Sequence, residues 1–249
     1  KYIKNGYILD RIMSNLQQHS YLLNAVGRPD DALNILEKAM HTNVLALKLD
    51  PENHIWIASR LTNEILKIKY CYQSNHCSNI KNDISKTEDD LRKIKTIISQ
   101  RSYNVKLADL YLYKAKVIAK SDLSSAETII NTALQKYKEI NGEDDLSITS
   151  KLIDAYVEKA FLMKKIIKNG DYKSFCKTAV SLVNDSYKKN KSFKLVIPYA
   201  SALKCLGELE YNSELKNIVE SENLTEVISD HRWRENVYSN IKDKSDCGI

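Results

Sequence analysis

Glycine and proline are scarce in this chain of 249 residues, which has only six glycines and three prolines. An all-β sandwich or barrel needs turn residues about every 8–12 positions, so this composition excludes it. The hydrophobic fraction of 43% is too high for a disordered polymer. Helices joined by short polar loops need few such residues, so the scarcity favours an all-α fold.

Long apolar runs are also missing. Runs such as 44–47 are far short of the roughly 20 residues that a membrane-spanning helix needs, so we expect no membrane partner. The five cysteines are odd in number and irregularly spaced, which favours reduced thiols and a cytoplasmic location over a disulfide framework. We expect Cys176 and Cys205 to be small core residues on helices.

Catalytic signatures are lacking too. The glycines never cluster, so the chain can build neither a phosphate-binding loop nor a dinucleotide fingerprint, and we expect no enzyme and no cofactor. Cys71, His76 and Cys77 lack the second ligand pair of a closed zinc site, so we expect no metal. The acidic pairs 89–90 and 144–145 are expected at helix N-termini, where the helix dipole favours carboxylates.

What the sequence does contain is helical periodicity. The segment from Pro29 places one apolar stripe at Ala32, Ile35, Leu36, Ala39 and Met40. A second stripe follows Ser121 and Asp122, which are candidate caps. It consists of Ala126, Ile129, Ile130, Ala133, Leu134 and Tyr137.

The same periodicity predicts about ten or eleven helices, paired in hairpins. Residues 73–82 form a polar stretch between two of them. No Pro/Gly/Ser-rich linker divides the chain, so we expect 1–249 to be one continuous domain, and its start at Lys1 suggests a piece of a larger protein. The predicted helices are 7–26, from 29 onward, 55–72, 91–98, 105–120, from 121 onward, 146–168, 172–187, 193–206, 215–219 and 233–241.

Several of these residues carry a family resemblance. The run Val26-Gly27-Arg28-Pro29-Asp30-Asp31-Ala32, with Leu36, Ala39 and the later Asp50-Pro51, resembles the second half of a tetratricopeptide repeat. Asn169-Gly170-Asp171-Tyr172 is similar to the same turn. The resemblance implies an α-solenoid with long, irregular repeats; a generic helical bundle is the alternative.

A tetratricopeptide-like solenoid implies a non-enzymatic scaffold that binds a protein or peptide on its concave face. The resemblance places the first helix of each hairpin on that face. The two-carboxylate clamp of some family members is not found here. The candidate lining residues are Gln17, Tyr21, Tyr113, Lys114, Lys159 and Met163.

Two other functions stay open. The chain could be the C-terminal sensor module of a larger signal-transduction ATPase or peptide-responsive regulator, which predicts an upstream P-loop or helix-turn-helix domain. Residues 151–204 carry 12 lysines against four acids, a net charge of +8, which could bind nucleic acid. A solvated helix face with the aromatics in the core is the alternative. The lysines proposed for such a surface are Lys164, Lys165, Lys168, Lys188 and Lys189.

Overall fold

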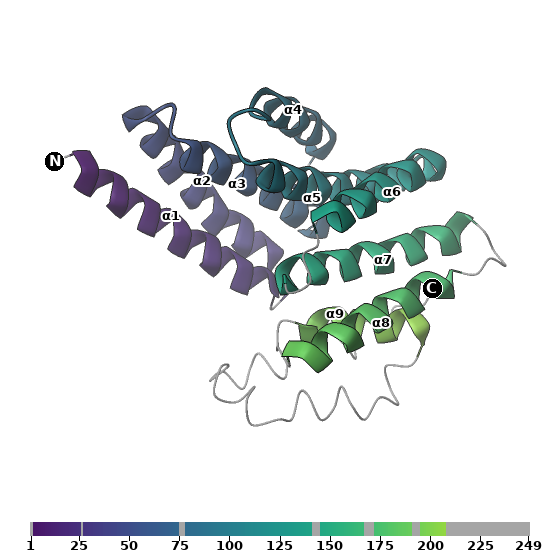
Figure 1. The fold of residues 1–249 in the computed structure, drawn as a ribbon. Coiled ribbons are helices and arrows are strands. Elements are labelled where there is room, and N and C mark those ends of the chain that lie inside the picture. Colours follow the sequence, from purple (N-terminus) through teal and green to yellow (C-terminus); the bar gives the residue numbers. More distant parts are fainter. Residues whose placement is uncertain are drawn as a thin grey trace. The chain divides into compact units, whose positions relative to one another are not determined.

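The computed structural model of the chain describes residues 2–25, 27–74, 78–140, 145–166, 172–190 and 195–207 (Figure 1). All regular secondary structure in these ranges is helical, which confirms the all-α class. The nine helices are α1 (Tyr2–Ala25), α2 (Pro29–Leu49), α3 (His54–Ser74), α4 (Ile80–Lys93), α5 (Gln100–Ile118), α6 (Leu123–Ile140), α7 (Leu146–Ile166), α8 (Lys173–Asn190) and α9 (Val196–Leu206).

The number of helices in the described ranges is lower than the ten or eleven predicted. The helices predicted at 215–219 and 233–241 lie outside the described residues. None of the nine is both long and apolar enough to cross a membrane. The chain divides into two compact units, 1–117 with α1–α5 and 118–249 with α6–α9. The single continuous domain stays a prediction.

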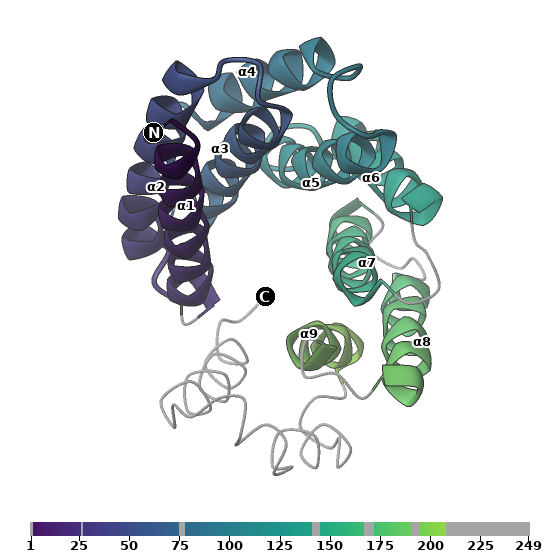
Figure 2. The same ribbon diagram turned by 60° about the vertical axis from the view of Figure 1, so that its left-hand side comes forward.

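In unit 1, α2 packs against both α1 and α3, and α3 also contacts α4. Figure 2 shows α1, α3 and α5 on one side of this unit and α2 and α4 on the other. The predicted apolar stripe of α2 makes the contact, with Ala32, Leu36 and Ala39 fully buried against Leu66 and Tyr70 of α3. An alanine has only a Cβ, so the helix axes approach closely at these positions. The stripe is therefore confirmed.

The boundaries of the helices follow local signals in the sequence. Gly27 has φ 77°, a left-handed conformation that costs glycine little, and Pro29 opens α2 directly after this turn. Asn53 caps α3, because its Oδ1 accepts hydrogen bonds from the backbone N–H of Ile55 and Trp56 at 3.1 and 3.2 Å. The predicted cap Asp122 accepts a bond from the N–H of Ser125 at 3.0 Å.

Unit 2 contains the predicted hairpin of α7 and α8, which is confirmed, and α9 packs against both helices. On the other side of the hairpin α6 contacts α7, burying Ala126, Ile130 and Ala133 of the second predicted stripe. In α9, Leu195 at the N-cap, Tyr199 and Leu203 are at most 3% exposed. This unit is therefore held by apolar packing on successive helices.

The prediction for residues 73–98 was wrong. The helix was expected at 91–98, after a polar stretch at 73–82, but the structure has α4 at Ile80–Lys93 and turns beyond it. The buried residues of α4 follow helical spacing at Ile84, Thr87, Glu88 and Leu91. Two of these four are polar, so hydrophobicity alone did not reveal the stripe.

The prediction for one of the two acidic pairs is also corrected. Asp89 and Asp90 lie near the C-terminus of α4, where they pair with Arg92 at 3.2 Å and Lys93 at 3.0 Å, rather than at a helix N-terminus. Asp145 does cap α7, accepting from the N–H of Ile148 at 3.1 Å. Sequence position alone did not distinguish these cases, because both acidic pairs stand among polar residues.

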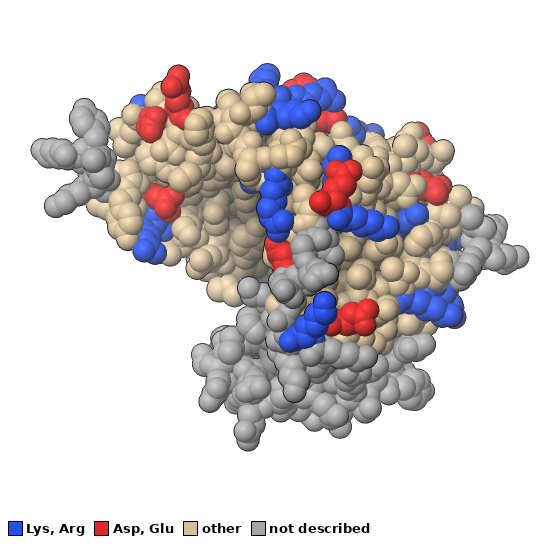
Figure 3. Space-filling model, in the orientation of Figure 1, with Lys and Arg blue, Asp and Glu red and all other residues tan. Residues whose placement is uncertain are grey.

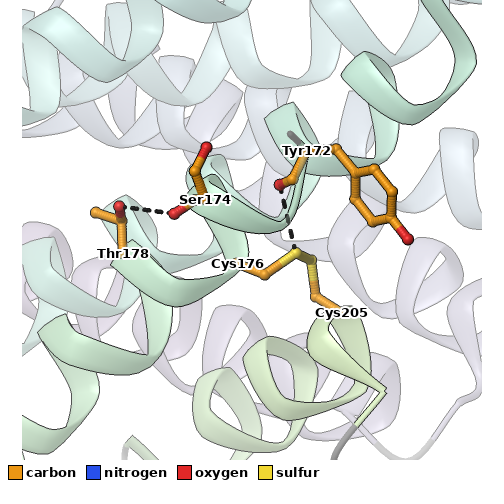
Figure 4. Close-up of a disulfide and its surroundings, with 5 residues drawn as sticks. All are labelled: Tyr172, Ser174, Cys176, Thr178 and Cys205. Carbon is orange, nitrogen blue, oxygen red and sulfur yellow. Dashed lines mark hydrogen bonds between the residues drawn. A yellow bond between two sulfur atoms is a disulfide. The ribbon is translucent and has the colours of Figure 1, made fainter. Parts of the chain in front are cut away.

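Cys176 and Cys205 are buried on helices as expected, but their thiols are not free. They form a disulfide between α8 and α9, with the Cα atoms 5.6 Å apart (Figure 4). The two residues are 29 positions apart in the sequence, so only the packing of α9 on α8 brings them together. The free-thiol prediction is wrong for this pair.

Replacing Ala39 by leucine should destabilise the protein by about 1–3 kcal/mol, because the added atoms have no space between α2 and α3. Urea unfolding followed by circular dichroism measures the loss. Asn34→Leu, at an exposed position of the same helix, is the matched control and should change the free energy of unfolding by less than about 0.5 kcal/mol. Equal effects of the two substitutions would contradict close packing at Ala39.

Candidate functional site

Two of the predicted site residues, Gln17 and Tyr21, lie on the side of unit 1 formed by α1, α3 and α5. Gln17 Nε2 donates hydrogen bonds to Ser59 Oγ at 3.1 Å and to Asn63 Oδ1 at 2.6 Å, both on α3. On the other side of α3, Lys106 Nζ of α5 donates to Thr62 Oγ1 at 2.5 Å. Polar contacts therefore connect the three alternate helices side to side.

Tyr21 is 44% exposed, yet the surrounding protein affects its hydroxyl. Burial raises the pKa of Tyr21, and the charges of Tyr70 on α3 and Asp109 on α5 raise it further. The Tyr21 side chain thus keeps exposed area, while groups on α3 and α5 influence its hydroxyl. We define the α1–α3–α5 face as Gln17, Tyr21, Ser59, Thr62, Lys106 and Asp109.

Tyr113 and Lys114 are adjacent on α5 but contact different parts of unit 1. Tyr113 is half-buried against the core of unit 1, and Lys116 Nζ lies 5.5 Å from the centre of its ring. Lys114 Nζ lies 2.5 Å from Glu88 Oε2 on α4. Lys114 thus points to α4 and does not join the α1–α3–α5 face.

Glu88 is the centre of a polar cluster between α4 and α5. The sequence did not reveal this cluster, because the helix that carries Glu88 was predicted at 91–98. Only 7% of the residue is exposed. Its Oε1 accepts hydrogen bonds from Arg92 at 2.8 Å and from the Tyr111 hydroxyl at 3.2 Å. Burial alone would raise the pKa of Glu88, but Lys114, Tyr111 and Arg92 together hold it below its ordinary value. The cluster ties α4 to α5.

Two ion pairs also join α3 to α4, and one of their members, Arg60, lies beside Glu64 as well. Arg60 lies 3.7 Å from Glu64 and 3.6 Å from Asp90, and Lys67 pairs with Asp83 at 3.1 Å. Burial raises the pKa of Glu64, and the carboxylates of Asp90 and Asp83 add to this effect against Arg60 and Lys86. The buried Glu88 and the partly buried Glu64 therefore differ: the fold favours the charged form of Glu88 and disfavours that of Glu64.

In unit 2, two of the three predicted site lysines of α7 lie against aromatic rings. Lys159 Nζ is 4.3 Å from the ring centre of Phe175, and Lys164 Nζ is 5.5 Å from that of Tyr172. Burial lowers the pKa of Lys159; Glu127 opposes this shift and Lys138 adds to it. Such cation–π contacts hold neighbouring segments together. The aromatics that alternate with lysines in the sequence thus contribute to internal packing.

The remaining predicted residues are placed as follows. Met163 is half-buried, and Lys165 and Lys189 are exposed. Lys188 belongs to α8 by its backbone, and Lys168 lies outside the described residues. Figure 3 shows basic and acidic side chains interspersed on one face of the molecule. A nucleic-acid surface at 151–204 stays a prediction.

The metal candidates are only partly described. Cys71 is 3% exposed and disulfide-bonded, so its sulfur is not a thiolate ligand, while His76 and Cys77 lie outside the described residues. Within the described ranges, His, Cys, Asp and Glu form no group of three or more that could hold a metal ion.

Comparison with known proteins adds no further evidence. No protein-family model, no curated protein and no solved structure matches this chain. The tetratricopeptide resemblance therefore stays a prediction.

The opposite pKa shifts of Glu88 and Glu64 predict opposite changes in stability when each carboxylate is neutralised. Glu88→Gln should lower the free energy of unfolding at pH 7 by about 2–4 kcal/mol, because Lys114 and Arg92 lose a charged partner. Glu64→Gln should raise it at the same pH, because burial disfavours the charged carboxylate. Urea denaturation of both variants measures these changes. Asp89→Asn, next to Glu88 but exposed, is the control and should change little.

The pH dependence follows from the same shifts. The fold lowers the pKa of Glu88. Its carboxylate therefore adds to the free energy of unfolding when the pH is above the unfolded-state pKa of about 4.3, and this stabilisation is lost as the pH falls through the folded-state pKa. The fold raises the pKa of Glu64. Its contribution to the free energy of unfolding is therefore present when the pH is below the unfolded-state pKa, and it is lost as the pH rises through the folded-state pKa. If Glu64→Gln raises the free energy of unfolding no more at pH 7 than near pH 4, this interpretation of Glu64 is wrong.

Proposed function

We propose that this chain is a non-enzymatic binding protein built as a tetratricopeptide-like helical repeat, and that the α1–α3–α5 face of unit 1 holds a peptide or a segment of a partner protein. The arrangement of helices in unit 1 supports this proposal. Three alternate helices share one side, and their side chains are connected by hydrogen bonds across helix boundaries.

The chemistry of the face supports a peptide ligand. Besides the exposed ring of Tyr21, the α1–α3–α5 face carries an amide, two hydroxyl groups, a lysine and a carboxylate, at Gln17, Ser59, Thr62, Lys106 and Asp109. Such groups recognise the carbonyl and N–H groups of a peptide backbone, while an aromatic ring supplies apolar contact area. Rings of this kind are frequent among the residues that dominate protein interfaces.

The observation that carries the proposal is the environment of Tyr21. The ring is 44% exposed, although the surrounding protein and the groups on α3 and α5 raise the pKa of its hydroxyl. The side chain therefore combines accessible ring area with a hydroxyl that is influenced by α3 and α5. A ligand that covers the ring would bury apolar area between polar groups from three helices.

Peptides selected from a random display library on the intact protein provide the test. Tyr21→Ala should weaken their binding at least tenfold, since it removes the accessible ring of the face. Fluorescence anisotropy with a labelled selected peptide measures the affinity, and circular dichroism confirms that each variant is folded.

Adjacent residues of α1 are matched controls. Gln18 and Leu22 are exposed and are turned about 100° around the helix from Gln17 and Tyr21. Gln18→Ala and Leu22→Ala should leave the affinity unchanged within about twofold. If the peptides bind Tyr21→Ala as tightly as the wild type, or if only the control variants lose binding, the ligand lies elsewhere and the proposal fails.

A further inference from the structure

Three of the five cysteines are oxidised in the described part of the chain. Cys176 and Cys205 are bonded to each other in unit 2, and Cys71 in unit 1 is also disulfide-bonded. All three are buried, with exposed fractions of 0%, 8% and 3%. Oxidised cysteines in both units indicate a property of the environment in which the whole chain folds, since cytosolic thiols are kept reduced.

The bond between α8 and α9 crosslinks elements that already fit together. Cys176 lies on the same buried side of α8 as Ala179 and Val183, which are fully buried. Tyr199 and Leu203 of α9 are also buried, and α9 packs against both α7 and α8. Packing therefore presents the two cysteines to each other, and oxidation makes that contact covalent.

Access to the sulfur atoms decides whether such a bond is labile. Reduction requires a thiolate to attack one of the two sulfurs, so a buried disulfide resists exchange in the folded protein. Cys176 has no exposed surface and Cys205 has little. Figure 4 shows the bridge between the two helices. This environment favours a lasting crosslink over a regulatory switch.

We propose that this protein folds and works in an oxidising compartment, where Cys176–Cys205 is a lasting crosslink of α9 to α8. In its formation the two thiols lose two protons and two electrons to a small-molecule or protein disulfide, which is reduced to two thiols. An oxidising compartment takes the place of the cytoplasmic location expected from the number and spacing of the cysteines.

Trapping thiols in the cells that naturally make the protein tests the compartment. The cells are treated with N-ethylmaleimide before lysis, and the peptides of the purified full chain are analysed by mass spectrometry without reduction. We expect Cys176 and Cys205 to be unmodified and linked in at least nine-tenths of the molecules. Maleimide on both cysteines in most molecules would overturn the proposal.

Reduction of the purified full chain tests the crosslink. We expect millimolar dithiothreitol to reduce Cys176–Cys205 at least tenfold more slowly in buffer than in denaturing urea, because the fold shields the sulfurs. Equal rates in the two conditions would show an accessible bond and overturn the lasting crosslink.

A variant provides a second measurement. The double substitution Cys176→Ser and Cys205→Ser should lower the Tm by roughly 5–15 °C, because it frees the unfolded chain from a crosslink. If this variant does not fold, the Tm of the wild type with and without a phosphine reductant gives the same comparison. An unchanged Tm in either case would contradict a stabilising crosslink.

Discussion

The close approach of helices at alanine is the constraint on which the rest of unit 1 depends. Ala32 and Ala39 have no exposed surface and lie where α2 packs between its neighbours. With α2 in that place, α1 and α3 come near enough for Gln17 to reach Ser59 and Asn63. The polar contacts of the α1–α3–α5 face are thus a consequence of small side chains on the opposite layer.

Helix α4 packs against its neighbours in a different way from α2. It offers few apolar side chains, and ionic contacts supplement them: Asp83 and Asp90 face α3, and Glu88 faces α5. Charges in such partly buried places are stabilising only where partners neutralise them. Burial raises the pKa of Glu64, and its charged neighbours do not offset this effect. Burial also acts on Glu88, but its three partners outweigh it, so the pKa shifts of the two glutamates have opposite directions.

Unit 2 shows how one composition supports two interpretations. Lysines alternating with aromatics in α7 and α8 are compatible with a nucleic-acid surface or with a packed hairpin. The structure assigns Lys159 and Lys164 to aromatic rings, so their aliphatic stems and charges contribute to cohesion. The exposed Lys165 and Lys189 still leave positive charge at the surface.

Periodicity and turn chemistry in the sequence were sufficient to determine the helical class, the stripe of α2 and the turn at Gly27, because these depend on neighbours within a few residues. The sequence could suggest Gln17 and Tyr21 as candidate binding residues from their place on the first helix, but it could not predict the residues that they contact. Tertiary structure alone decided the place of α4, the orientation of Lys114 and the pairing of Cys176 with Cys205. Each of these joins residues at least 26 positions apart or depends on charges from another helix, and local patterns carry no information on such distances.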